Sequence, residues 1–133
     1  MKHNTAQTAK QLYTSNLFRR AKKYAETNYD DWFVLSAKNY LLEPNEKIKP
    51  YDESLSQMTS NQRMNWAKKV YTQISSKYPD PACCKFFFHA GELYRKQLIN
   101  LLREKGYVCE EPLKGLRIGE QIAWYKKSGQ QIL

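Results

Sequence analysis

The sequence predicts an α/β fold in three layers, in which a small, mostly parallel sheet of about three to four strands is flanked by helices. Helix-like and strand-like segments alternate along the chain, as they do around a parallel sheet. Nearly continuous apolar runs mark the strand-like segments, which is typical of strands covered on both faces. The 133 residues have room for one domain with a core. We therefore expect a single domain over 1–133, with 1–11 and 129–133 loose at its ends.

The first elements are a helix, a strand and a long loop. Ser15 can cap a helix over 16–25, because the apolar residues of that segment recur on one helical face. A strand is expected over 31–37, where the apolar run begins with a tryptophan and a phenylalanine. Residues 38–58 contain two prolines and many polar residues, so we expect an irregular segment there. Its length favours a functional loop.

A second helix and a second strand follow this loop. Thr59 and Gln62 match a capping box, which predicts that a helix begins at residue 60. Apolar residues at helical spacing continue the pattern until Pro79 ends it. Residues 83–89 are largely apolar and predict a buried strand, which a short Ala-Gly turn separates from the next segment.

The last elements complete the alternation. An amphipathic helix is expected from Gly91 to Gly106, and Gly106 is a typical glycine just past a helix end. A short strand over 107–109 and a helix over 119–127 follow. Leu93 is assigned to the buried stripe of the amphipathic helix, together with Leu98, Leu101 and Leu102.

The charge balance favours an anionic partner. The chain has 22 basic and 13 acidic residues, a net charge of +9. Nucleic acid, a nucleotide or an acidic protein would each suit such a surface, and the competing interpretation is that the charge only provides solubility. Ten tyrosines and three tryptophans leave aromatic surface for stacking on bases, although most rings are expected in the core.

Several protein classes are not supported by the composition. No apolar run is long enough to span a membrane, and the first ten residues lack the apolar region of a secretory signal. Three cysteines do not make a disulfide framework, so we expect free thiols in the cytoplasm, with Cys83, Cys84 and Cys109 packed in buried strands. Two histidines give no zinc-site spacing, and no Gly-rich phosphate loop indicates a nucleotide cofactor. We expect neither a metal nor a cofactor.

The carboxyl ends of the strands are the expected binding site, because ligands of open parallel sheets bind there. The first strand ends in a small, polar, cationic cluster, and the second ends at an Ala-Gly turn that leads into a helix N-terminus, which favours anions. The competing interpretation is that the glycine only permits a tight turn and the histidine belongs to the core. The candidate ligand-binding residues are Ser36, Lys38, Asn39, His89, Gly91, Tyr94 and Arg95.

Further candidates lie in the long loop and near the C-terminus. Tyr51 and Asp52 place an aromatic ring beside a carboxylate, a pair that could bind the face and edge of a base. Asp52 and His89 are the candidate acid–base residues if a reaction is catalysed. Gly119 and Gln121 could add backbone and amide contacts.

The basic clusters have two interpretations. Lys68 and Lys69 belong to one of them, and the others lie in the segments 19–23 and 126–127. Each is expected as a solvated helix face unless folding gathers the clusters on one side, where they would form a phosphate track.

Five segments resemble a family of uncharacterised small α/β proteins of bacteria and phages. They are LYTSNLFRRAKKYAE, WFVLSAKNYLLEPNEKIKPYDESL, NWAKKV, HAGELYRKQLINLLREKGY and PLKGLRIGEQIAWY, which together cover roughly residues 10–127. The run from LSAK to PYD is also distantly similar to the YaaA-type peroxide-stress proteins. Those proteins are associated with DNA binding and are compared with glycosylase-like folds. The resemblance implies a nucleic-acid or nucleobase context.

Two departures from that family pattern weaken any inherited chemistry. Family members open with a strand that this chain lacks or keeps only as a remnant around Lys2-His3-Asn4. They also have glycine where Tyr40 stands, since AKNYLL replaces the expected AKxGLL. Both departures fit a protein that binds, or one that completes its sheet as a homo-oligomer, better than an enzyme.

Three functions remain open from the sequence. The first is binding of nucleic acid or a nucleotide at the strand ends. The second is sequestration of a nucleotide signal of host defence by a phage protein, which would act in the host cytoplasm. The third is an enzyme, glycosylase-like or hydrolase-like, that acts on a nucleobase or nucleoside.

Overall fold

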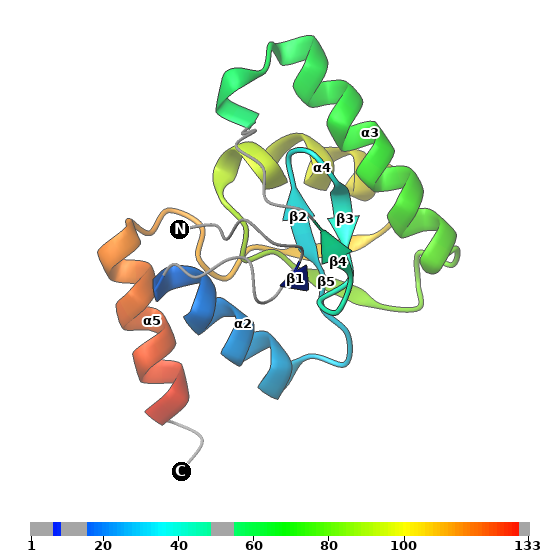
Figure 1. The fold of residues 1–133 in the computed structure, drawn as a ribbon. Coiled ribbons are helices and arrows are strands. Elements are labelled where there is room, and N and C mark those ends of the chain that lie inside the picture. The colour runs from blue at the N-terminus through cyan, green and yellow to red at the C-terminus, as the bar shows by residue number, and fades with distance from the viewer. Residues whose placement is uncertain (1–6, 9–15, 49–54, 131–133) are drawn as a thin grey trace. The chain divides into compact units, whose positions relative to one another are not determined.

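The computed structural model describes residues 7–8, 16–48 and 55–130 (Figure 1). The contacts of the chain divide it into two compact units. Unit 1 comprises Met1–Val34, Glu43–Tyr51 and Leu113–Leu133, and unit 2 comprises Leu35–Leu42 and Asp52–Pro112.

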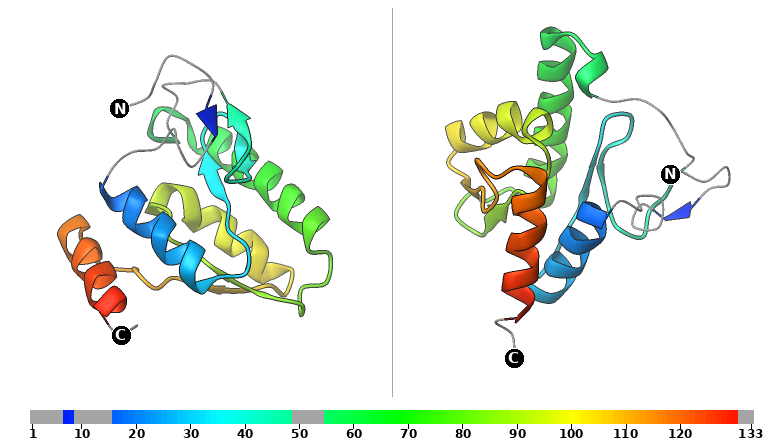
Figure 2. Two further views of the ribbon diagram at one scale, coloured as in Figure 1. Left: turned by 60° about the horizontal axis from the view of Figure 1, so that its bottom comes forward. Right: turned by 90° about the vertical axis from the view of Figure 1, so that its left-hand side faces the viewer.

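Unit 1 is built on two helices, α2 (Asn16–Asn28) and α5 (Ile118–Gln130), which pack together (Figure 2). Aromatic rings make this contact: the ring centroids of Tyr24 and Trp124 lie 5.0 Å apart, and Tyr125 meets Tyr24 edge-on at 5.8 Å. The unit also contains a short antiparallel pair, β1 (Gln7–Thr8) and β4 (Lys47–Ile48).

Unit 2 combines two longer helices with a parallel strand pair. The helices are α3 (Ser60–Lys77) and α4 (Glu92–Glu104), which pack against each other. The strands β5 (Lys85–Phe87) and β6 (Val108–Glu110) run parallel, with α4 as the crossover between them. The short 3-10 helix η1 (Leu55–Gln57) precedes α3 and contacts α4.

The core of unit 2 lies between α3 and α4. In α3 the buried residues recur at helical spacing, and in α4 they lie in the middle of the helix. Each helix therefore buries one face. Leu55 of η1 closes one end and is fully buried. The buried side chains of the two helices are Trp66, Ala67, Val70, Ile74, Leu98, Ile99 and Leu102.

A hairpin of β2 (Val34–Ser36) and β3 (Tyr40–Leu42) packs on α3. The three-residue connection requires an antiparallel pair, because a parallel pair needs a crossover of a dozen or more residues. Gln73 of α3 bonds to both backbone groups of Leu41: its Oε1 accepts from the amide at 2.9 Å, and its Nε2 donates to the carbonyl at 3.4 Å. The side-chain amide therefore occupies the edge of β3, as a further strand would.

The helices expected from the sequence are all confirmed, and so is the mixed α/β character. The capping box of α3 is present, with Thr59 Oγ1 accepting from the Gln62 amide at 3.2 Å and Gln62 Oε1 accepting from the Thr59 amide at 2.8 Å. Gly106 follows α4 with a φ of 91°, the left-handed conformation that favours glycine. A three-layer arrangement around one sheet of three to four strands is not confirmed, since the described strands pair two at a time.

Some local predictions were wrong. The segment 38–58 was expected to be irregular, yet it forms β3, β4 and η1. Within the ends that were expected to be loose, residues 7–8 lie in β1 and α5 continues to Gln130. The remaining residues of 1–11 and 131–133 lie outside the described part of the chain.

Burial also differs from the expectation at three residues. Cys83 is exposed and Cys84 half-buried, because β5 begins only at Lys85. Leu93 is 44% exposed, since it lies in the first turn of α4 before the buried stripe begins.

Tyr40 adopts a left-handed backbone conformation, which favours glycine. Its φ is 63°, and it is the only non-glycine residue with a positive φ in the part of the chain described. A side chain in this region costs roughly 1–2 kcal/mol. The ring is half-buried, and its hydroxyl accepts from Lys69 Nζ at 3.1 Å.

This strain gives a prediction for two substitutions. Tyr40→Gly and Tyr40→Ala both remove the ring and its contact with Lys69, but only glycine removes the left-handed strain. We expect Tyr40→Gly to unfold at a higher urea concentration than Tyr40→Ala, by about 1 kcal/mol in the free energy of unfolding. At an ordinary strand position alanine is the more stable of the two, so the opposite order would contradict the left-handed backbone.

Candidate functional site

The small, polar residues after β2 close the hairpin turn. Ser36 is 1% exposed, and its Oγ accepts from the Asn39 amide at 3.0 Å. The Ser36 carbonyl accepts from Trp66 Nε1 at 2.8 Å. Both polar groups of Ser36 therefore have partners within the chain. Lys38, in the turn itself, is exposed, and Asn39 is half-buried.

Trp66 connects this hairpin to the N-terminus of α4. The indole is 3% exposed, and its ring meets that of Tyr94 edge-on, with centroids 5.7 Å apart. Tyr94 lies in the first turn of α4, three residues after the N-cap Gly91. The structure thus brings Ser36 and Tyr94 to the same tryptophan. Sequence reasoning missed Trp66 itself, whose signal was a tryptophan on the apolar stripe of α3.

Gly91 begins α4 without a side-chain cap. Its φ of −63° is open to any residue, and a Cβ added there would meet only the Tyr94 ring, at 4.0 Å, which is an ordinary contact. Neither the backbone nor the space requires glycine at this position. Serine or aspartate would cap the helix better. The interpretation that Gly91 only permits a tight turn therefore has no support in the local geometry.

Arg95 is bound within the chain. Its Nε donates to Glu111 Oε1 at 2.9 Å and its Nη1 to the Ala90 carbonyl at 3.1 Å. The two side chains of the ion pair are 16% and 14% exposed. Arg95 thereby ties the turn before α4 to the segment after β6. The charge of Arg95, which the sequence predicted would bind an anionic ligand, is paired with the carboxylate of Glu111.

His89 lies between β5 and α4 and is half-buried. Burial lowers the pKa of its imidazole from 6.5 to about 4, because the charged form is poorly solvated there. His89 is therefore neutral at pH 7. A neutral imidazole can accept or donate a hydrogen bond to a ligand but supplies no positive charge.

The lowered pKa of His89 predicts a loss of stability in acid. An unfolded chain protonates this residue below about pH 6.5, whereas the folded protein resists protonation until about pH 4, so stability falls as the pH decreases through that window. We expect His89→Gln to remove about 2 kcal/mol of the difference between pH 7 and pH 5 in the free energy of unfolding. Urea titrations of both proteins at the two pH values measure it. Equal pH dependence would contradict the burial of the imidazole.

The other predicted residues lie in unit 1 or outside the described part of the chain. Gly119 and Gln121 lie in the first turn of α5, in unit 1, where Gln121 Nε2 donates to the Leu116 carbonyl at 2.9 Å. Tyr51 and Asp52 lie outside the described residues. Among the residues that are described, no group of three or more His, Cys, Asp or Glu could hold a metal ion.

The exposed face of α3 is the second site feature that sequence reasoning missed. The helix contains four basic residues and no carboxylate. Five of its exposed residues recur at i, i+4, i+7, i+11 and i+15, so these five form one stripe along the helix. All of them are uncharged hydrogen-bonding residues or lysine. We call this stripe the α3 face; it comprises Asn61, Asn65, Lys68, Thr72 and Ser76.

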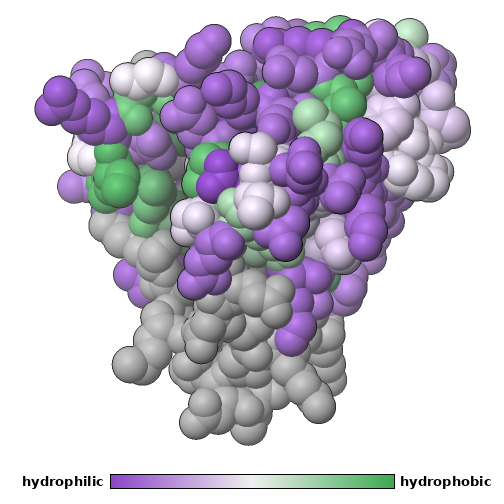
Figure 3. All heavy atoms as spheres, turned by 90° about the horizontal axis from the view of Figure 1, so that it is seen from above, coloured by the Kyte–Doolittle hydropathy of each residue, from purple (hydrophilic) through white to green (hydrophobic). Residues whose placement is uncertain are grey.

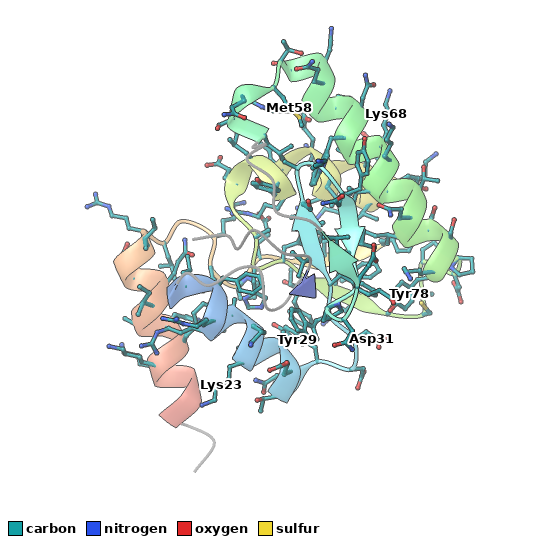
Figure 4. The ribbon with its side chains drawn as sticks, in the orientation of Figure 1. Lys23, Tyr29, Asp31, Met58, Lys68 and Tyr78 are labelled. Carbon is teal, nitrogen blue, oxygen red and sulfur yellow. The ribbon has the colours of Figure 1, made fainter. Side chains whose placement is uncertain are left out.

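Lys69 flanks the α3 face and faces the hairpin. Its Nζ lies 4.9 Å from the centroid of the Tyr40 ring and donates to the Tyr40 hydroxyl. Lys68, one residue earlier, projects away from the ribbon of α3 (Figure 4). Hydrophilic residues make up most of the coloured surface in Figure 3. The edge of α3 nearest β3 thus combines a lysine with an aromatic ring.

No described helix is long and apolar enough to cross a membrane. No curated protein and no solved structure gives a significant match to the chain. One family model matches residues 1–127. Because this match covers almost the whole sequence, the chain belongs to DUF6884, a family of unknown function.

Proposed function

We propose that this protein binds nucleic acid through phosphate contacts made by the α3 face. The observation that carries the proposal is the charge of α3, which has four basic residues and no carboxylate over 18 residues. A surface helix that is only solvated has basic and acidic residues interspersed, because pairs four residues apart stabilise it. Here no basic residue of α3 has an acidic partner on its own helix.

Acidic residues are also absent from the first turn of α3, where they would stabilise the helix most. Aspartate and glutamate stabilise the first turn of a helix by interaction with its dipole, yet the first turn of α3 has none. Even the capping box uses Gln62, although glutamate would serve. A carboxylate on this face would repel a polyanion, which gives a functional reason for a composition that helix stability does not favour.

The uncharged residues of the α3 face suit the same partner. Asparagine, serine, threonine and lysine are common donors to phosphate oxygens. The stripe from Asn61 to Ser76 contains 15 residue-to-residue steps, or about 22 Å along the helix. That length allows contact with several phosphates, and such contacts position a backbone without reading its sequence.

The strand-end cluster supports a small anionic ligand less well. His89 is neutral at pH 7, Arg95 is paired with Glu111, and Glu92 occupies the first turn of α4. The uncapped N-terminus at Gly91 and the ring of Tyr94 are more suitable for a base or a neutral group. A nucleotide sequestered as a signal, or a nucleobase substrate, would have to use these groups with Tyr51 and Asp52.

The remaining expectations belong to the same proposal. A nucleic-acid partner places the protein in the cytoplasm, or in the cytoplasm of a host if the gene belongs to a phage. A second copy of the chain could complete the sheet of the expected three-layer fold. The distant similarity to YaaA-type proteins is consistent with a nucleic-acid context.

The salt dependence of binding tests the proposal. Fluorescence anisotropy of the protein with labelled DNA and RNA oligonucleotides, and with a labelled dinucleotide, should be measured between 50 and 300 mM salt, about the range where such contacts weaken. We expect log K to fall against log salt with a slope steeper than about −2.7 for a duplex, which corresponds to at least three phosphate contacts. Preference for the dinucleotide with a shallow slope would favour sequestration, and failure to bind any oligonucleotide would remove the proposal.

A further inference from the structure

Two adjacent cysteines form a cluster that the proposed function does not use. Cys83 and Cys84 lie in the turn before β5, and their Sγ atoms are 2.7 Å apart. Cys83 is exposed and Cys84 half-buried, so reagents in solvent can reach the pair. Cys109, the third cysteine, is buried in β6 and is 5% exposed.

The turn holds the two thiols on the same side. Asp80 fixes it from within, since its Oδ1 accepts from the Ala82 amide at 3.0 Å and its carbonyl accepts from the Cys83 amide at 3.0 Å. The peptide chain therefore presents both sulfur atoms together before any bond forms. The separation of 2.7 Å exceeds a covalent S–S bond, about 2.05 Å, by well under 1 Å.

We propose that Cys83 and Cys84 are a reversible redox modification site, at which a hydroperoxide closes a disulfide between the two neighbouring residues. One thiolate attacks the peroxide, the O–O bond breaks, and a sulfenic acid forms with release of water or an alcohol. The second thiol then attacks the sulfenic sulfur, the S–S bond forms, and a second water leaves. The pair loses two protons and two electrons, and the peroxide takes up both as it is reduced.

The bond should be easily reduced again. Neighbouring Cα atoms are about 3.8 Å apart, whereas ordinary disulfides join Cα atoms about 4.4–6.8 Å apart. Strained and exposed disulfides have higher reduction potentials and are the labile, regulatory ones. We therefore expect the disulfide to form reversibly and not to act as a permanent structural bond.

The Cys84 thiol is not activated by charge. Desolvation and the hydrogen bond with Cys83 raise the pKa of Cys84 to about 11, so little Cys84 thiolate exists at neutral pH. We expect slow oxidation at pH 7 and faster oxidation at pH 9. What distinguishes this pair is the proximity of the second thiol, which closes the ring after the first oxidation.

Intact-mass measurement of the full chain tests the proposal. After treatment with hydrogen peroxide at pH 8, we expect a loss of about 2 Da, restored by dithiothreitol, with peptide mapping placing the bond between residues 83 and 84. Cys109→Ser should behave like the wild type. Cys83→Ser and Cys84→Ser should lose the 2 Da change and gain oxygen at the remaining exposed thiol instead.

Three other outcomes would contradict the proposed redox site. A disulfide between two copies of the chain would show that the pair does not close. Loss of the 2 Da change in Cys109→Ser would show that the buried thiol is a partner. Stepwise oxygen addition in the wild type, without a 2 Da loss, would show that the neighbouring thiols react independently. None of these measurements depends on nucleic-acid binding.

Discussion

Replacement of Trp66 by alanine should lower the free energy of unfolding by about 3–5 kcal/mol, the largest change that we expect from one substitution in this protein. Trp66 is 3% exposed and contacts both the hairpin and the start of α4. Alanine would leave a cavity and also remove the donor to the Ser36 carbonyl. Urea denaturation followed by far-UV circular dichroism gives the midpoint and slope that define the change.

Two controls separate packing from hydrogen bonding. Trp66→Phe keeps most of the ring volume but loses the Nε1 donor, so we expect a smaller loss of about 1–3 kcal/mol from the unsatisfied carbonyl. Trp124→Ala removes an equal side chain from a half-buried position in α5 and should cost less than Trp66→Ala. A change below about 1 kcal/mol for Trp66→Ala would show that the indole does not connect the two elements.

Neutralising two lysines of α3 should produce the largest functional change. In Lys68→Gln/Lys69→Gln the slope of log K against log salt should become less steep by about 2, because each phosphate contact contributes about 0.9. Affinity for DNA at 150 mM salt should fall about tenfold. Both side chains are exposed, so the free energy of unfolding should change little. Anisotropy at graded salt and urea denaturation measure the two effects.

The matched control removes the same charge from unit 1. Lys126→Gln/Lys127→Gln neutralises two exposed lysines of α5, so both double variants have a net charge of +7, which is +9 less 2. We expect the control to keep the wild-type salt slope. If both variants weaken binding equally, net charge and not the α3 face controls affinity. If only the control weakens it, the interface lies in unit 1.

Local sequence signals determined the helices. The capping box at Thr59, the apolar stripe of α3 and the glycine after α4 act within one or two turns of chain, so they can be read without knowledge of the fold. The acid-free composition of α3 was equally visible, although its significance depended on knowing which side faces solvent. The glycine expected at position 40 also carried structural information, since the backbone there is left-handed.

Only the tertiary structure decided how strands pair and what each polar residue at a strand end does. Apolar runs show that a strand is buried but not which strand it joins, and β2 pairs with its own hairpin partner while β5 pairs with β6. Ser36 was expected to offer a donor to a ligand, but its partners are Asn39 and Trp66, the latter 30 residues away in sequence. The partners of Arg95 were equally hidden, because Glu111 reaches it only once β6 lies beside β5. Contacts of this kind depend on chain segments far apart in sequence, and no local pattern records them.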